Sequence, residues 1–406
     1  TCLFAILAAG LFMFLSASLP AGELLKQSNL LNYNPAIQIF HGQLNAQVAG
    51  NPQAIGPETI DLPAYSLADR EMLSAYMDGL VESYMKEYRA AAGVVVIVNE
   101  GETVFRKGYG YQDISASKPA DPASTLFRQG SISKLFTWIA IMQQVELGRL
   151  DLDADVNEYL DSFSVPSKFD EAISLRSIMS HTPGFEDILL KLFVREGDPV
   201  PPLERILRNQ MPRRIMPPLS EAAYSNYGNG LAQYILEKVS GMRFETYVEE
   251  NILNPLGMTN TTFRQPLPEH MKSNMAKAYA WQEGRFIEKG FEIVPMTGAC
   301  GASATADDML IFMKSLQNHS RHDTISLLDS TSYALMHEEV IRHAPRMNPA
   351  LPGFIDMSPE HTRVIGHGGN TFLFHSLLAM LPEHDTGIYM SFSGESAAPI
   401  TNHIMN

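Results

Sequence analysis

The side chains of Ser131 and Lys134 have the types and the spacing needed for nucleophilic catalysis. They belong to Ser131-Ile132-Ser133-Lys134, which follows Phe127-Arg128-Gln129-Gly130 and opens an apolar stretch, 135–150, that predicts a helix. Positions i and i+3 share a helix face, so the lysine can take the proton of a serine hydroxyl that is otherwise a poor nucleophile. The helix N-terminus adds positive potential, which favours a neutral lysine amine and a developing alkoxide. The pair predicts an acyl-transfer site of the Ser-Lys type.

The spacing Ser-x-x-Lys is not specific by itself, because it occurs at Ser83 to Lys86, Ser115 to Lys118 and Ser131 to Lys134. The first pair lies within a predicted helix, where both side chains can face solvent. The second runs into Pro119, which indicates a loop without a helix to hold the geometry. Only the third stands where a strand-rich region ends and a long helix begins, so Ser131 is the predicted nucleophile.

A second motif, Tyr224-Ser225-Asn226, precedes a helix predicted over 231–239. A tyrosine hydroxyl beside a lysine can carry protons between nucleophile and leaving group. In an extended loop Asn226 points the same way as the tyrosine and can bind both the lysine and a substrate amide. Tyr227-Gly228-Asn229 overlaps with the same pattern, and the residue types alone do not separate the two.

A third motif, Gly366-His367-Gly368-Gly369-Asn370, stands immediately before a predicted strand. Glycines at a strand edge let a ligand approach the backbone closely. A free amide there, together with the amide of Ser131, would form an oxyanion hole with two donors. The alternative for such a segment is a simple tight turn.

The elements that must position these motifs predict an α+β fold. Strand patterns around two turns predict hairpins, formed by 93–98 with 103–110 and by 374–381 with 387–392. Helix signals cover 67–91, dominate from 131 to about 255, and return at 397–406, where a final helix is expected to be truncated. Strands at both ends with helices between them predict one antiparallel sheet built from both termini and flanked by helices, with a helical subdomain inserted.

Three regions are predicted along the 406 residues. Residues 1–22 carry no charge and contain a 14-residue apolar run, 2–15, followed by small residues, which favours a signal peptide over an N-terminal anchor. Residues 23–66 predict a linker or N-terminal extension. Residues 67–406 predict the folded domain, with its sheet part in 67–130 and 290–406 and its helical part in 131–289.

Composition narrows the function and the location. Charged residues make up 18% and apolar residues 45%, as in a globular protein, and the net charge of −15 argues against nucleic-acid binding. Cys300 is the only cysteine outside the apolar run, so a cleaved protein has no internal disulfide. We expect a bacterial protein exported to the periplasm or beyond. Membrane association is conceivable through the N-terminal segment or through sequence after Asn406.

Four ordered segments resemble the class C β-lactamase-related serine hydrolases, which include low-molecular-weight penicillin-binding proteins, D-aminopeptidases and β-lactamase-like carboxylesterases. They are Phe127-Arg128-Gln129-Gly130-Ser131-Ile132-Ser133-Lys134, Leu175-Arg176-Ser177-Ile178-Met179-Ser180-His181-Thr182-Pro183-Gly184, Tyr224-Ser225-Asn226 and Gly366-His367-Gly368-Gly369. Asn254-Pro255-Leu256-Gly257-Met258 and the segment 301–309 are also similar to connecting segments of that family. The resemblance runs from about Leu67 to the C-terminal end.

The resemblance implies a β-lactamase/transpeptidase-like fold and a role for each motif. Ser131 would be the nucleophile, with Lys134 and Tyr224 as base and proton relay, and Tyr227 would be coincidence. Asn226 would contact substrate. Substrate binding is also implied for His367, Gly368 and Gly369, and the oxyanion hole for the backbone amides of Ser131 and Asn370. The resemblance implies no metal and no organic cofactor.

One departure from the family concerns the substrate. Class C β-lactamases and many penicillin-binding proteins carry Lys-Thr-Gly where this chain has His367-Gly368-Gly369. An ammonium suits the carboxylate of a β-lactam or of a C-terminal D-alanine, whereas an imidazole near its reference pKa of about 6.5 is mostly neutral at pH 7. The departure makes efficient β-lactamase activity doubtful and leaves the fold assignment intact.

The leading hypothesis is therefore a serine hydrolase that is acylated and deacylated on a small-molecule or peptide substrate. Peptidase or penicillin-binding activity and carboxylesterase activity rank nearly level, and β-lactamase activity ranks third. The alternative is a catalytically weak penicillin-binding sensor of the envelope that forms a stable acyl adduct. A Ser-His-Asp hydrolase is disfavoured because the chain has no Gly-x-Ser-x-Gly elbow. His181 is expected to be a hydrogen-bonding residue at a helix end.

Overall fold

The computed structural model describes residues 67, 69–186, 192–195, 197–317, 325–359 and 361–405. These residues belong to one unit, 65–406. The predicted signal peptide, 1–22, and the predicted extension, 23–66, lie outside the described residues, so both stay predictions. Within the described part of the chain no helix is long and apolar enough to cross a bilayer.

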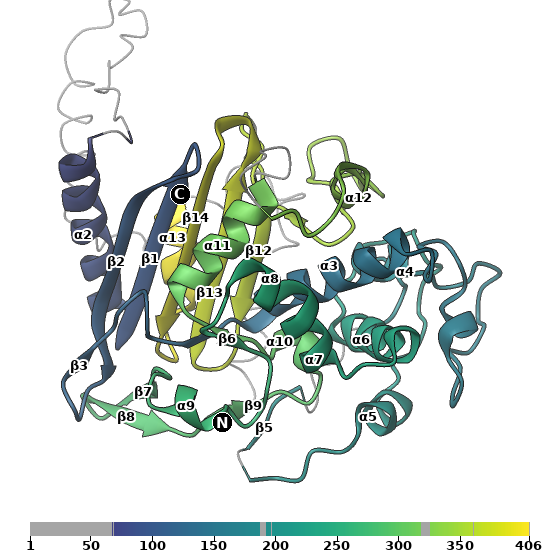
Figure 1. The fold of residues 1–406 in the computed structure, drawn as a ribbon, viewed down its shortest axis with the longest axis horizontal. Helices are drawn as coiled ribbons and strands as arrows, with labels where there is room; N and C mark the ends of the chain where they lie inside the picture. Colours follow the sequence, from purple (N-terminus) through teal and green to yellow (C-terminus); the bar gives the residue numbers. More distant parts are fainter. Residues whose placement is uncertain are drawn as a thin grey trace, which may run out of the picture. The chain divides into compact units, whose positions relative to one another are not determined.

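A seven-stranded antiparallel sheet in the order β11-β12-β13-β14-β1-β2-β3 is the largest element of this unit (Figure 1). Its strands are β1 (Ala92–Asn99), β2 (Glu102–Asp113), β3 (Lys118–Pro119), β11 (Ile355–Asp356), β12 (Ile365–Asn370), β13 (Phe374–Leu381) and β14 (Thr386–Ser393). The early and late strands meet where β1 pairs with β14, from Ala92 opposite Ser393 to Asn99 opposite Thr386. Both predicted hairpins form, as β1–β2 and β13–β14, and the predicted α+β class is confirmed.

Strand β1 is buried on both faces, which explains why its sequence is a continuous run of β-branched residues. Successive side chains of a strand point to opposite faces. Accordingly Val94 and Val96 belong to the larger hydrophobic core, and Val95 and Ile97 belong to the smaller one. Two separate cores therefore hold the sheet in place, one on each face.

Helices α2 (Arg70–Glu87) and α13 (Ala398–Met405) cover the face with the smaller core, where Val81 and Ile400 are fully buried. Helix α11 (Ala306–Gln317) packs against β1 and β14 on the other face (Figure 1). Helix α2 begins at Arg70 rather than at the predicted residue 67, because the Asp69 carboxylate caps it by accepting from the Met72 amide at 3.0 Å.

The helical part lies beside the sheet and is centred on α3 (Ser133–Glu146), of whose 14 residues 11 are buried. A helix buried on nearly all sides has little freedom to move, which suits an element that must hold catalytic groups. The remaining helices are α4 (Leu175–Met179), α5 (Leu203–Asn209), α6 (Asn226–Ser240), α7 (Phe244–Val248), α8 (Asn254–Leu256), α9 (Glu269–Lys272), α10 (Thr297–Cys300) and α12 (Ser330–Met336), with a π-helical turn at Glu249–Leu253.

Short strands complete the fold: β4 (Phe127–Arg128), β10 (Ser303–Ala304) and β6 (Thr261–Thr262) in one sheet, β5 (Val194–Arg195) with β9 (Glu292–Ile293), and β7 (Ala278–Gln282) with β8 (Arg285–Lys289). The β7–β8 hairpin falls within the part predicted to be helical and was not predicted. Its signal was Glu283-Gly284, a two-residue turn with positive φ at both positions. The predicted division into sheet and helical parts stays a prediction.

Candidate active site

Ser131 lies at the point where the chain leaves the sheet and enters the central helix. It occupies a 3₁₀ turn, Gly130–Ile132, that runs directly into α3, so the serine stands in the first turn of a continuous helical segment. The predicted helix, 135–150, therefore starts earlier and ends at Glu146, and Gly148 follows in the left-handed conformation. The predicted helical spacing holds, and Lys134 Nζ donates to Ser131 Oγ at 3.1 Å.

Lys134 is completely buried, and its amine nitrogen donates to three oxygen acceptors. Besides Ser131 Oγ, Nζ donates to Asn226 Oδ1 and to Ala299 O, both at 2.8 Å. The hydrogen bonds to Asn226 Oδ1 and Ala299 O orient the nitrogen, and its remaining bonding position points at the Ser131 hydroxyl. This arrangement lets a proton pass between Ser131 and Lys134 without any movement of the lysine side chain.

Tyr224 and Asn226 flank the residue that starts helix α6. Ser225 is the N-cap, since its Oγ accepts from the Gly228 amide at 3.0 Å. The helix predicted over 231–239 therefore begins five residues earlier, and Asn226 belongs to its first turn rather than to an extended loop. The prediction failed because Tyr227, Gly228 and two further small or polar residues hide the helical period.

The Tyr224 ring lies under the lysine, with Lys134 Nζ 4.9 Å from its centroid. The side chain is 36% exposed, yet desolvation of the hydroxyl raises the pKa of Tyr224 above its usual value. The charge of Lys134, together with the polar influence of Lys134 and Ser131 on the phenol, opposes that rise only in part. The phenol therefore holds its proton at neutral pH and lies within reach of both partners, as a proton relay requires.

Tyr227, the alternative tyrosine, serves the core. Its hydroxyl donates to Leu207 O at 3.1 Å, and its ring packs edge-on against Phe185. Burial raises the pKa of Tyr227, and its hydroxyl proton is engaged by the carbonyl of Leu207. The structure brings Tyr224, and not Tyr227, to Lys134.

The motif around His367 is itself a strand, β12, rather than a turn ahead of the C-terminal hairpin. It pairs with β13, with His367 opposite Leu378 and Gly369 opposite Ser376. Three glycines in five residues are typical of turns, which is why the sequence concealed the strand. Here Gly369 serves a close approach, because a Cβ on it would meet Gln129 O at 2.0 Å.

That close approach joins the end of β12 to the turn before the nucleophile. Gly130 has φ +52°, and a Cβ on it would lie 2.5 Å from the backbone nitrogen of Asn370. The backbone that carries the Asn370 amide is thus in direct contact with the backbone that carries the Ser131 amide. The two predicted oxyanion donors lie on touching segments, and their role stays a prediction.

A buried carboxylate holds the turn that follows Asn370. Glu292 accepts from Thr371 Oγ1 at 2.6 Å and from the Phe372 amide at 2.8 Å. Burial raises the pKa of Glu292, and these hydrogen bonds and the charge of Arg128 oppose the rise. The end of β12 is therefore fixed from both sides.

His367 is neutral and enclosed. Its Nδ1 contacts Gly368 O, which can only accept, so the proton is on Nδ1 and the Nε2 lone pair is free. Nε2 is buried and finds no partner among the described residues. Burial lowers the pKa of His367 to about 3, and the charge of Lys134 adds to the effect. The ring is 3% exposed and lies edge-on to Tyr224 at 6.1 Å, so its predicted contact with substrate stays a prediction.

Two residues of the site were not predicted as part of it. Cys300 Sγ lies 3.5 Å from Ser131 Oγ and 3.9 Å from Lys134 Nζ, although the sequence analysis considered it only as a disulfide partner. Its position directly before Gly301, the first residue of the segment 301–309 that is similar to a connecting segment of the family, was the available signal. His181 was expected at a helix end, and it also lies against Tyr224, with 4.3 Å between the ring centroids.

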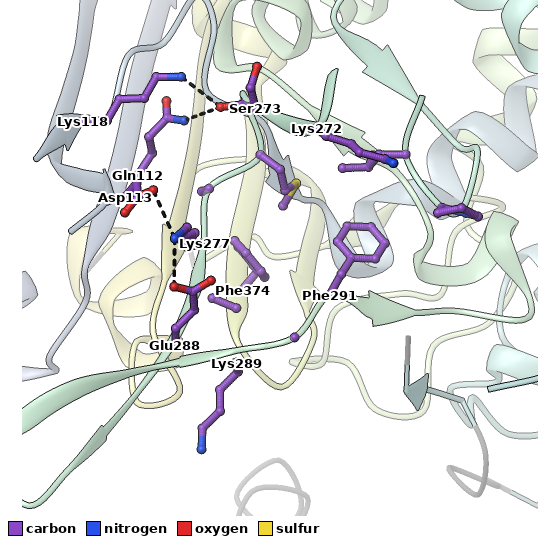
Figure 2. A pocket seen from close by; sticks show the side chains of 16 residues that line it. Gln112, Asp113, Lys118, Lys272, Ser273, Lys277, Glu288, Lys289, Phe291 and Phe374 are labelled. Atoms are coloured by element: carbon purple, nitrogen blue, oxygen red, sulfur yellow. Dashed lines mark hydrogen bonds and ion pairs between the residues drawn. The ribbon is translucent and has the colours of Figure 1, made fainter. Parts of the chain in front are cut away.

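A separate cleft of about 490 Å³ contains none of these residues (Figure 2). Several of its polar side chains are paired: Lys277 bridges Asp113 and Glu288, and Lys118 donates to the backbone carbonyl of Ser273. No cluster of three or more metal-ligating side chains occurs in the described ranges. Of the features described, the constellation at Ser131 is the one equipped for covalent chemistry.

A family model described as Beta-lactamase matches residues 77–402. The chain belongs to the β-lactamase family. The predicted β-lactamase/transpeptidase-like fold and the resemblance to class C relatives are thereby confirmed. Members of this family are serine hydrolases.

Relatives of this β-lactamase-family chain carry different names. It is 24% identical over 339 residues to "Protein flp" of Staphylococcus aureus (strain MW2), covering 81% of this chain and 65% of that protein. It is 28% identical over 223 residues to "Esterase EstB" of Burkholderia gladioli, covering 52% of this chain and 56% of that one. The chain thus spans less than two thirds of the length of these curated relatives.

Among solved structures, the octameric penicillin-binding protein homologue from Pyrococcus abyssi superposes with a TM-score of 0.72 at 25% identity. The match covers 82% of this chain and 76% of that one. The name of each relative describes that protein, so the substrate of this β-lactamase-family member has to be argued from its own site.

Proposed function

We propose that this protein is a serine acyl hydrolase acting on esters and amides that lack a carboxylate beside the scissile bond. The observation that carries the proposal is the contact between Lys134 Nζ and Ser131 Oγ, because a buried amine held by two other acceptors can serve as a base. Esters rank first for two reasons. One relative is named an esterase, and ester substrates depend least on a charged side chain that binds a carboxylate.

In the proposed acylation, Ser131 Oγ attacks the carbonyl carbon while its proton passes to Lys134. The carbonyl oxygen becomes an oxyanion that the amides of Ser131 and Asn370 stabilise. Tyr224, protonated at neutral pH, donates to the leaving oxygen or nitrogen and recovers a proton from Lys134. The carbon–heteroatom bond breaks, the alcohol or amine departs, and an acyl-serine remains.

Deacylation reverses the roles of the same groups. Water gives a proton to the Lys134–Tyr224 pair and attacks the acyl carbon, again through the oxyanion site. The tetrahedral intermediate then expels Ser131 Oγ, which regains its proton, and the free acid leaves. No group outside the described site is needed for either half-reaction.

The restriction on substrate charge rests on His367. The imidazole is neutral, and its Nε2 carries a lone pair rather than a proton. It therefore does not attract a carboxylate, whereas the lysine of Lys-Thr-Gly relatives does. Uncharged esters and amides lose nothing at such a site. Carboxylate-bearing β-lactams and D-Ala-D-Ala peptides would lose an ion pair there, so we rank them lower.

The test compares the wild-type protein with Ser131→Ala on four substrate types: p-nitrophenyl butyrate, D-amino-acid amides, D-Ala-D-Ala peptides and nitrocefin. We expect turnover of the ester that disappears in Ser131→Ala and persists in Ser83→Ala, a serine with the same spacing to a lysine on an exposed helix face. A fluorophosphonate probe should label only proteins that retain Ser131.

A charge exchange at the strand tests the substrate class. His367→Lys is expected to raise activity on nitrocefin relative to the ester, because it restores a cation at the anchor position. Hydrolysis of nitrocefin by the wild type at a rate matching the ester would overturn the substrate restriction. A stable penicillin adduct without any turnover would instead support an acyl-binding sensor.

A further inference from the structure

We propose that His181 is a positioning residue of the acyl-transfer site, holding Tyr224 and Asn226 in place through one imidazole. The inference rests on the proposed function and adds to it a residue outside the Ser131, Lys134, Tyr224 and Asn226 set. It starts from contacts of His181 that a residue merely ending a helix does not need.

The backbone of His181 anchors the segment that leads to Tyr224. His181 follows helix α4 with a left-handed φ of +56°, which is uncommon for a residue with a side chain. In that conformation its carbonyl accepts from the Ala223 amide at 2.7 Å, and the carbonyl of the next residue, Thr182, accepts from the Leu219 amide at 2.8 Å. The chain before the tyrosine is therefore tied to the 181–182 turn.

The imidazole reaches one step further along the same segment. Its Nδ1 accepts a hydrogen bond from the Ser225 amide at 3.2 Å. Ser225 is the N-cap of α6 and stands between Tyr224 and Asn226, so a single bond fixes the backbone between two site residues. The same ring packs on Tyr224 at 4.3 Å, with an angle of 32° between the planes.

The bond to Ser225 requires a neutral His181, because a protonated imidazole has no acceptor. The surroundings of His181 favour the neutral imidazole. The His181 side chain is buried, and the charge of Lys134 and the ring of His367 lie close to it. Burial first, then Lys134, lowers the pKa of His181 well below its ordinary value. Nδ1 thus stays an acceptor across the neutral range.

The consequence concerns the distance between the phenol and its proton partners. The Tyr224 ring packs against His181 and forms a T-shaped pair with His367, and these two contacts restrict rotation of the ring away from Lys134. A shift of about 1 Å in a reacting group can cost about 100-fold in rate. Loss of the imidazole should therefore slow the chemical step and leave substrate affinity nearly unchanged.

The test compares His181→Leu with His181→Asn in the full chain. Leucine keeps bulk and removes the acceptor, whereas asparagine tolerates positive φ and places an oxygen near the position of Nδ1. His343→Leu is the matched control, since His343 Nε2 accepts from the Ala222 amide at 2.9 Å, whereas the described rings that contact Tyr224 are those of His181 and His367. Each protein is assayed for kcat, KM, thermal melting and the rate of labelling by a fluorophosphonate.

We expect His181→Leu to lower kcat and the labelling rate about 10- to 100-fold with KM within about threefold. His181→Asn should recover most of the loss, and His343→Leu should stay within about threefold of wild type. Equal kcat in His181→Leu and wild type would overturn the inference. An equal decrease in kcat in His181→Leu and His343→Leu would also overturn it, as would a decrease in kcat that is fully explained by a lower melting temperature. If wild type itself shows no turnover or labelling that depends on Ser131, the proposed function fails first, and the inference falls with it.

Discussion

Replacing Lys134 with methionine tests the central contact of the site, because methionine keeps nearly the same length and removes only the amine. In the native structure the amine is fully buried and touches Ser131 Oγ, Asn226 Oδ1 and Ala299 O. The variant leaves the serine without a base at 3.1 Å, removes the side-chain donor to Ala299 O, and leaves Asn226 Oδ1 with the weak thiol donor of Cys300.

The expected loss of activity can be set against the expected loss of stability. Removal of a positioned general base costs about 10²- to 10⁴-fold in rate, which corresponds to about 2.7 to 5.4 kcal/mol. Losing the amine as donor to these two buried oxygens costs at most about 1–3 kcal/mol each. The variant also no longer bears the desolvation cost of a buried amine. This gain offsets part of the loss in stability, and it is of the same order of magnitude as the cost of the lost hydrogen bonds. Since folded domains are stable by about 5–15 kcal/mol, the Lys134→Met protein should remain folded.

The assay is hydrolysis of p-nitrophenyl butyrate at pH 7 to 9, with circular dichroism and thermal melting as checks on folding. Lys86→Met is the matched control, because Lys86 also follows a serine by three residues and lies exposed on helix α2. A surface change of this kind alters stability by less than about 0.5 kcal/mol. The control should therefore keep full activity.

One result would refute the role assigned to Lys134. If Lys134→Met folds and retains more than about a tenth of the wild-type kcat/KM, the lysine does not accept the serine proton. The base would then have to be Tyr224 alone, and its raised pKa would place the activity of the variant at strongly alkaline pH. A variant that fails to fold is distinguished by its circular dichroism, and labelling of Ser131 in Lys134→Ala then decides the question.

Two further predictions use other parts of the structure. Tyr224→Phe should lower kcat by about 100-fold or more, whereas Tyr227→Phe should keep kcat and lose about 1 kcal/mol of stability with its bond to Leu207 O, as urea melts would show; equal kcat in the two variants would contradict the assignment. Burial lowers the pKa of His367 to about 3 and of His375 to about 4. Below the unfolded value of about 6.5 only the unfolded chain binds these protons, so the free energy of unfolding should fall as pH decreases from 6.5 to about 4, and less so in His375→Gln. An identical pH dependence of the two proteins would refute the second prediction.

Much of the fold could be predicted from local sequence patterns, because these patterns do not depend on tertiary contacts. The run Gly93-Val94-Val95-Val96-Ile97-Val98 with its Asn99-Glu100-Gly101-Glu102 turn determined a hairpin, and the α+β class followed from strands at both ends. The helical spacing of Ser131 and Lys134 was also local, because residues three apart on a helix meet wherever that helix lies.

Helix and strand limits were less predictable where glycine and polar residues obscure the period. Helix α6 starts at Asn226 because Ser225 caps it, and β12 is a strand although it contains three glycines. In both cases tertiary contacts outweigh local propensity: the cap is held by His181, and Gly369 is needed for contact with Gln129. A pattern of residue types carries no information about such partners.

What the sequence by itself determined is a serine, a lysine and a tyrosine with the chemical capacity for acyl transfer. The tertiary structure brought Tyr224, which the residue types alone did not separate from Tyr227, to the lysine, placed Cys300 beside the nucleophile, and enclosed His367. The physical reason is that capacity belongs to functional groups, whereas distance, desolvation and protonation depend on segments far apart in the chain. The Ser131 site draws on the start of α3, the start of α6, the end of α10 and strand β12, and only folding brings them together.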